Sequence, residues 1–354
     1  MNIRDLLFSA RKHDASDIHV LAGTPPMFRI HGDIVPARGD ALTSDEIERM
    51  LDEVVTPMQR ERLEREWQLC VSLVYANTGR ARLTVYRRNG RNELAIRMSE
   101  LSIRTREQLG IPAIVDDLAR KPNGLVILSG PTGVGKTTTL HYMLDLINAE
   151  RPSKIVTIED PIEYVHTFKK SIIVQQELMV DVSDYTTALR HVLRQDPDVI
   201  AVGEMRDPET IYTALLAAET GHLVIATLHT PGAADVVQRI VSAFPDGRQS
   251  EIRFMLAGTL QAVISQQLLT RAANKGRVMS AEILVGTNAV RHHIRENTVH
   301  QLYTEMQNGR KYGMITLEQS LLDLYQSGDI TYETALNIAR HPDQIRKRAS
   351  RELV

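Results

Sequence analysis

The second half of the chain contains short, continuous apolar stretches, each followed by a segment with helical spacing. They are residues 125–128, 155–158, 199–202 and 223–227. Continuous apolar strands are typical of a sheet that is covered on both faces, and strand–helix alternation implies right-handed crossovers between parallel strands. In such a doubly wound sheet, ligands bind at the carboxyl ends of the strands. The pattern therefore predicts an α/β domain whose functional residues follow the strands.

The first hundred residues are mostly strand-like instead. A Gly32-Asp33 turn between apolar residues predicts a hairpin, and residues 44–66 predict two helices, the second of which begins at Pro57. We expect an N-terminal α+β domain at 1–100, a linker at 101–120, and the α/β domain at 121–354, which is mainly helical from about residue 250.

The composition excludes several classes of protein. The 42 Lys and Arg residues nearly balance the 44 Asp and Glu residues, so no global field favours nucleic acid, and we expect no nucleic-acid partner. The single cysteine, Cys70, can form neither an internal disulfide nor a multi-cysteine zinc site, and we expect a buried thiol. No apolar stretch approaches the ~20 residues of a membrane helix. We therefore expect a cytoplasmic protein, at most peripheral to a membrane.

The strongest motif follows the first apolar stretch. Residues 130–137 read GPTGVGKT, which matches GxxxxGK[ST] between a predicted strand and a predicted helix. In this motif backbone N–H groups surround phosphate oxygens, Lys136 reaches the β and γ phosphates, and the Thr137 hydroxyl ligates Mg²⁺. The motif predicts that ATP and Mg²⁺ are bound by Gly130, Pro131, Thr132, Gly133, Val134, Gly135, Lys136, Thr137 and Thr138.

An acidic residue, Glu204, follows the stretch at 199–202. It is placed to act as the general base that polarises the attacking water. The residue before it is Gly203, where a P-loop protein usually has an aspartate near Mg²⁺. Metal ligation is therefore expected to depend on Thr137, phosphate oxygens and water.

Three more carboxylates, Glu159, Asp160 and Glu163, follow the stretch at 155–158. They can organise water around the metal. In the alternative interpretation Asp160 caps a helix that begins at Pro161.

Histidines stand at both ends of the last apolar stretch. His229 follows the strand and can sense phosphate or bridge to Glu204, whereas His222 precedes it. A purely structural role is the alternative for both.

Arginines of the N-terminal half can supply positive charge to the γ-phosphate. A period of two places Arg80, Arg82, Thr84 and Tyr86 on one face of a strand, and Arg97 ends the next strand. The alternative is a solvated basic face on an edge strand.

A late segment at 286–296 predicts a helix. Val290 and Ile294 form an apolar edge for packing, while Arg291 and Arg295 form a parallel basic edge that is free for a partner. The alternative is a solvated helix surface.

The combination of segments resembles the secretion-superfamily ATPases, and within them the pilus retraction ATPases. The segments are GPTGVGKTTT at 130–139, TIEDPIEYVH at 157–166, DPDVIAVGEMRDPET at 196–210 and AAETGHLVIATLHT at 217–230. The resemblance implies a PAS-like N-terminal domain, a RecA-like motor domain and a homohexamer that drives type IV pilus retraction with an inner-membrane platform protein. It implies that Glu204 is the catalytic glutamate. It also implies catalytic roles for Lys136, His229, Arg82 and Arg97. It assigns nucleotide contacts to Glu159, Asp160, Glu163 and His222.

Two departures from the family pattern and several alternatives remain: Thr84 is one departure, and the pair His292-His293 within the late segment at 286–296 is the other. Thr84 stands where many relatives have an arginine, and Arg80 is the neighbouring candidate to replace that charge. One cysteine excludes the tetracysteine insertion of extension ATPases, which favours the retraction branch. The alternatives are a related type II/IV secretion or conjugative-pilus ATPase, a nucleotide-gated ring with little turnover, and a DNA-translocating ring.

Overall fold

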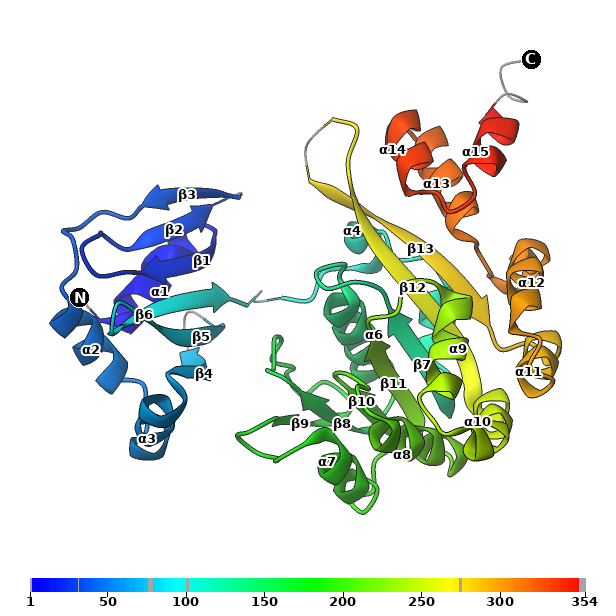
Figure 1. Cartoon of the computed structure of the whole chain (residues 1–354), viewed down its shortest axis with the longest axis horizontal. Helices are drawn as coiled ribbons and strands as arrows, with labels where there is room; N and C mark the ends of the chain where they lie inside the picture. Colours follow the sequence, from blue (N-terminus) through cyan, green and yellow to red (C-terminus); the bar gives the residue numbers. More distant parts are fainter. Residues whose placement is uncertain (1, 31, 76–78, 100–101, 274–275, 350–354) are drawn as a thin grey trace. The chain divides into compact units, whose positions relative to one another are not determined.

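A computed structural model describes residues 2–30, 32–75, 79–99, 102–273 and 276–349. The chain divides into two compact units (Figure 1). The N-terminal unit comprises Met1–Ile103 with Pro161–Val165, and the second unit comprises Arg104–Asp160 with His166–Val354. Residues 100 and 101, where we expected the first domain to end, lie outside the described residues.

The N-terminal unit is an α+β structure built on an antiparallel sheet. Its elements are α1 (Ile3–Lys12), β1 (Ala15–Val20), β2 (Met27–Ile30), β3 (Asp33–Pro36), α2 (Ser44–Asp52), α3 (Pro57–Glu66), β4 (Gln68–Tyr75), β5 (Gly79–Arg88) and β6 (Arg91–Met98). Within the described residues the strand order is β3-β2-β1-β6-β5-β4. The predicted hairpin is formed by β2 and β3, but Asp33 pairs with Ile30 and so belongs to the strand rather than to the turn.

The alternating pattern of β5 is confirmed by burial. Ala81, Leu83 and Val85 are at most 1% exposed and pack in the core of this unit, and the opposite face carries Arg80 and Arg82. Cys70 lies on that polar face of β4, so the expected buried thiol is wrong: Cys70 is exposed. Its sulfur accepts a hydrogen bond from Arg82 Nε at 3.0 Å.

The second unit is organised around a mixed sheet that contains the predicted parallel strands. Its strands are β7 (Gly124–Ser129), β8 (Lys154–Glu159), β9 (Ile172–Glu177), β10 (Val199–Val202), β11 (Leu223–Leu228), β12 (Leu260–Thr270) and β13 (Arg277–Val285). In the described residues they follow the order β13-β12-β7-β11-β10-β8-β9. All neighbours pair in parallel except β12 and β13. Every residue of β7, β10 and β11 is buried, which confirms a sheet covered on both faces.

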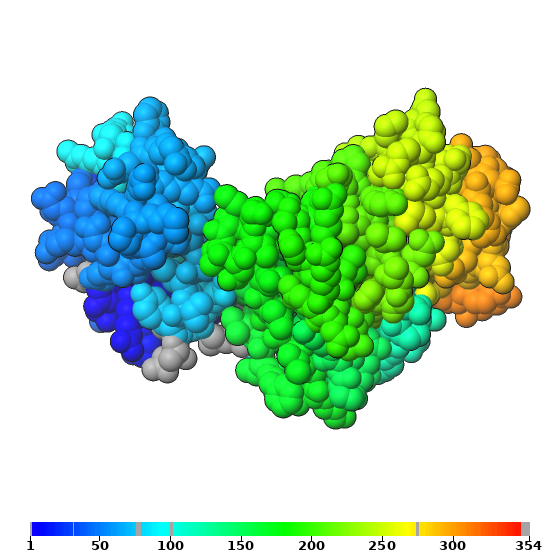
Figure 2. Space-filling model, turned by 90° about the horizontal axis from the view of Figure 1, so that it is seen from below, coloured from blue at the N-terminus to red at the C-terminus, as the bar shows by residue number. Residues whose placement is uncertain are grey.

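Helices connect and cover these strands (Figure 1). They are α4 (Arg106–Leu109), α5 (Ile114–Ala119), α6 (Lys136–Glu150), α7 (Tyr185–Val192), α8 (Pro208–Glu219), α9 (Ala233–Ser242), α10 (Asp246–Thr259), α11 (Asn288–Arg295), α12 (Leu302–Asn308), α13 (Leu317–Gln326), α14 (Tyr332–Ile338) and α15 (Pro342–Ala349). On the surface of this unit, the yellow and orange residues of α10, α11 and α12 lie side by side (Figure 2).

Helices predominate after residue 250, as expected, but this part of the chain also contains two long strands that the sequence pattern did not predict. The long strands β12 and β13 pair from Ala262↔Val285 to Thr270↔Arg277, and β12 also pairs with β7. Polar residues such as Ser265, Gln266 and Glu282 interrupt the apolar pattern of these strands, yet they are buried. Tertiary contacts therefore override the local signal. In the described part of the chain, no helix combines the length and apolar character that a bilayer crossing requires.

Candidate functional site

The P-loop connects β7 to α6 in the strand–loop–helix context that the motif requires. Gly130 has a φ of +127°, and a Cβ atom there would lie 2.4 Å from the carbonyl oxygen of Gln266, so only glycine fits. Gly135 is the N-cap of α6, and no side chain caps the helix. The first N–H groups of α6 are therefore available to phosphate oxygens, and the loop fits a nucleotide.

The Lys136 amine is hydrogen-bonded to the backbone of this loop. Its Nζ donates to the carbonyl oxygens of Gly130 at 2.6 Å and Pro131 at 2.8 Å, and it lies 3.4 Å from His229 Nδ1. Burial lowers the pKa of Lys136, and the negative charge of Glu204 opposes this effect. Thr137 and Thr138 follow in the first turn of α6, as the motif predicts.

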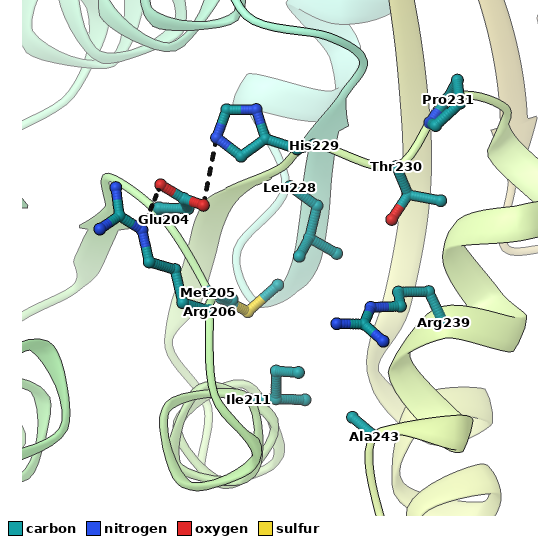
Figure 3. Close-up of a pocket in the computed structure, with 10 residues that line it drawn as sticks. All are labelled: Glu204, Met205, Arg206, Ile211, Leu228, His229, Thr230, Pro231, Arg239 and Ala243. Carbon is teal, nitrogen blue, oxygen red and sulfur yellow. Dashed lines mark hydrogen bonds and ion pairs between the residues drawn. The ribbon is translucent and has the colours of Figure 1, made fainter.

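Glu204 is held between His229 and Arg206 at the carboxyl end of β10. Its Oε1 lies 3.1 Å from His229 Nε2, and its Oε2 accepts a hydrogen bond from Arg206 Nε at 2.7 Å (Figure 3). Because Lys136 can only donate to His229 Nδ1, the imidazole proton lies on Nε2 and points to Glu204. The predicted bridge from His229 to Glu204 is therefore present, and it extends to the P-loop lysine.

A cavity of about 350 Å³ adjoins this cluster. Glu204 and His229 form part of its wall, Leu228 and Met205 contribute apolar surface, and Arg239 points into it from α9 (Figure 3). Glu204 thus borders this cavity.

Glu159 is a buried carboxylate with three polar neighbours. It is 4% exposed, accepts hydrogen bonds from Thr157 Oγ1 at 2.6 Å and Gln175 Nε2 at 2.9 Å, and lies 3.2 Å from His141 Nε2. Burial raises the pKa of Glu159, but the hydrogen bonds from His141, Thr157 and Gln175 outweigh it, and the pKa is lowered. Glu159 therefore stays ionised at neutral pH.

His141 also meets a second histidine. Its Nδ1 lies 2.8 Å from His166 Nε2, and burial, followed by the charge of His141, lowers the pKa of His166 to about 4. Sequence reasoning did not select either histidine as a functional residue. His141 lies in the middle of α6, five positions beyond Lys136. Its contact is with a strand that comes later in the sequence, and no local pattern predicts such a contact.

The other two predicted acidic residues, Asp160 and Glu163, differ from Glu159 in their surroundings. Asp160 is exposed, and no helix begins at Pro161 among the described residues, so the capping alternative is wrong. Glu163 falls in Pro161–Val165, which belongs to the N-terminal unit.

His222 lies at the amino end of β11, where its Nδ1 is 2.8 Å from the carbonyl oxygen of Ala217. Within one chain, His222 does not join the cluster around His229.

Arg82 and Arg97 are directly opposite each other on β5 and β6, and both are exposed. Arg97 Nε donates to Asp17 Oδ1 at 3.0 Å, and Arg80 Nε donates to Ser72 Oγ at 3.0 Å. Like charges at directly opposite positions destabilise a sheet. Their action on a nucleotide stays a prediction.

The basic edge predicted on α11 is only partly correct. Val290 and Ile294 are fully buried, as expected. Arg291, however, is not free for a partner: its guanidinium donates to the carbonyl oxygens of Gly286, Ala257, Gly258 and Leu260. Three of these carbonyls belong to the end of α10 and the residue that follows it, so Arg291 caps that helix.

The fold and the P-loop site define this chain as a P-loop ATPase. The chain belongs to the type II/IV secretion system protein family, whose model matches residues 64–353. A twitching motility protein of Neisseria gonorrhoeae is 42% identical over 345 residues, which cover 97% of this chain and 92% of that protein. The type IV pilus retraction ATPase PilT of Pseudomonas aeruginosa is 40% identical over 343 residues, 97% of this chain and 99% of that protein.

A solved structure is similar over the same extent. The crystal structure of the pilus retraction motor PilT with bound ADP has a TM-score of 0.92 and 41% identity, and the match covers 98% of this chain and 99% of that one. These relatives confirm the predicted α/β fold, with a P-loop ATPase domain and an additional N-terminal domain, and the assignment to this group of ATPases.

Proposed function

We propose that this chain is the motor that retracts a type IV pilus and that it works as a homohexamer, in which ATP hydrolysis drives the removal of pilin subunits at an inner-membrane platform protein. The proposal is supported by the full-length similarity to retraction ATPases at 40–42% identity. It places the protein at the cytoplasmic face of the membrane, which it reaches through its partners. It also divides the work among an N-terminal domain at 1–100, a linker at 101–120 and the motor domain at 121–354.

The chemistry is carried by the connected series Lys136–His229–Glu204 at the carboxyl ends of three strands. The loop and Lys136 hold the phosphates. Glu204 accepts a proton from water as the water oxygen attacks the γ-phosphorus, and the bond to the β–γ bridging oxygen breaks to release ADP and phosphate. His229 joins the base to the phosphate-binding lysine, so phosphate at Lys136 is sensed by Glu204.

The Thr137 hydroxyl, together with phosphate oxygens, would hold Mg²⁺, which would neutralise phosphate charge when bound. We assign Glu159, the last residue of β8, and Asp160, which follows it, to holding water near the metal. Arg82 and Arg97 supply further positive charge, and because they lie in the N-terminal unit we assign them to a nucleotide bound across a domain or subunit boundary.

Deletion of the gene, with complementation, tests this function in cells. Cells without the protein are expected to carry excess pili that do not retract, and the wild-type chain, but not Lys136→Ala, should restore retraction. Normal retraction in the deletion strain, with a loss of protein export or conjugation instead, would support the alternative of a related type II/IV secretion or conjugative-pilus ATPase.

A further inference from the structure

Gly203 leaves no room for a side chain at the end of β10. A Cβ atom on this residue would lie 2.8 Å from the hydroxyl oxygen of Tyr185 and 3.0 Å from the carbonyl oxygen of Ile158. The Thr227 hydroxyl donates to the Gly203 carbonyl and holds this backbone in place from the neighbouring strand. The tyrosine hydroxyl therefore stands where the side chain of a carboxylate at position 203 would begin.

Tyr185 reaches this point from α7, on which it is the first residue. Its ring packs in the core with Ile158, Val202 and Met205, and the side chain is 8% exposed. A buried ring fixes the direction of its hydroxyl because the side chain has few other rotamers available. Here the hydroxyl is directed at the carboxyl ends of β8 and β10, the edge of the sheet at which the ATPase site lies.

The surroundings of this hydroxyl are highly charged. Burial raises the pKa of Tyr185, as do the negative charges of Asp160, Glu204 and Glu159, while Arg206 lowers it. The hydroxyl is therefore protonated at neutral pH and can donate a hydrogen bond. Among the residues that the structure describes, none is hydrogen-bonded to it. A nearly buried donor that faces carboxylates and has no protein partner is typical of a place that binds ordered water.

We propose that Tyr185 is a positioning residue for ATP hydrolysis, whose hydroxyl hydrogen-bonds a water molecule between Asp160 and Glu204 in the hydration shell of Mg²⁺·ATP. It takes the place of the carboxylate that Gly203 cannot provide. Water held there links the acidic residues after β8 to the base after β10, and it keeps Glu204 directed at the γ-phosphate. The proposal rests on the proposed role of Glu204, but not on which machinery the ATPase drives.

The variant Tyr185→Phe removes only the hydroxyl and retains the ring in the core. In the full-length protein we expect kcat for ATP to fall about tenfold, the effect of losing ~1.4 kcal/mol of transition-state stabilisation, with KM changed less than about twofold. A non-hydrolysable ATP analogue should bind the variant more weakly than the wild type in Mg²⁺, whereas in EDTA the two should bind it equally. The melting temperature should not change, because the lost hydroxyl has no protein partner.

Tyr142→Phe is a matched control. Tyr142 is 9% exposed and its hydroxyl donates to Asp116 Oδ1 at 2.6 Å, so this change removes a structural hydrogen bond and should lower the melting temperature but leave kcat unchanged. If Tyr185→Phe kept kcat within about twofold of the wild type, or weakened analogue binding equally with and without Mg²⁺, the proposal would be wrong.

Glu204→Gln separates this inference from the proposed function. If Glu204→Gln retained normal turnover, Glu204 would not be the base. The Mg²⁺-dependent difference in analogue binding would still decide whether Tyr185 holds water in the site.

Discussion

Replacing Arg291 by alanine should destabilise the second unit without disabling its chemistry. The guanidinium donates to four carbonyl oxygens, at 2.8 Å to Gly286, 3.1 Å to Ala257 and 3.0 Å to Leu260, besides Gly258. Ala257 and Leu260 are fully buried, so in the variant their carbonyl groups would lose a partner that water cannot readily replace.

The size of the effect follows from these contacts. Each buried carbonyl left unpaired costs roughly 1–1.5 kcal/mol, and the lost positive charge at the end of α10 costs about 0.5 kcal/mol more. The free energy of unfolding should therefore fall by about 3 kcal/mol, which lowers the melting temperature by ~6–12 °C in a unit of this size. Burial lowers the pKa of Arg291, but an arginine remains charged at neutral pH, so the capping is retained.

Thermal unfolding followed by circular dichroism, with ATPase activity measured well below the transition, checks this prediction. Arg295→Ala is the matched control, because Arg295 is exposed on the same helix and its loss should change stability by at most ~0.5 kcal/mol. Arg291→Lys should recover only part of the loss, since an ammonium group cannot reach all four carbonyls. If Arg291→Ala melted within about 2 °C of the wild type, the capping argument would be refuted, and the basic edge would again be a candidate for partner binding.

Three further predictions concern the site. Glu204→Gln should still bind ATP while hydrolysis falls by ~10²–10⁴, measured as phosphate release; near-normal turnover would reject the general base. Mixing Lys136→Ala with Arg82→Ala subunits should restore part of the activity if Arg82 serves a neighbouring nucleotide, and no recovery would favour action within one chain. Because His166 has a pKa of about 4 in the folded protein, its contribution to stability is complete above pH ~6.5 and is lost as the pH falls towards 4. In His166→Gln, the free energy of unfolding that is lost on acidification should be smaller by up to ~3 kcal/mol. An unchanged pH dependence of unfolding would contradict the assignment.

The strands and loops that build the nucleotide site were predictable from the sequence. Each strand at the centre of the sheet is a continuous apolar stretch, because a strand that is buried on both faces excludes polar side chains. The P-loop could be recognised because its glycines, which act through the backbone, and Lys136 are close together in the chain. Glu204 and His229 follow their strands directly, and parallel strands bring their carboxyl ends to one edge.

Only the tertiary structure decided which distant residues meet. The pairing of His141 with Glu159 joins α6 to β8, the Arg291 guanidinium caps a helix more than thirty positions earlier, and Tyr185 fills the space beside Gly203. The strands β12 and β13 were missed for the same reason, since their buried polar residues make long-range contacts such as that of Gln266 Nε2 with Thr139 Oγ1. Local spacing carries information about periodicity and backbone conformation, whereas the partner of a buried polar group depends on how the elements pack, and this is determined only when the whole unit has folded.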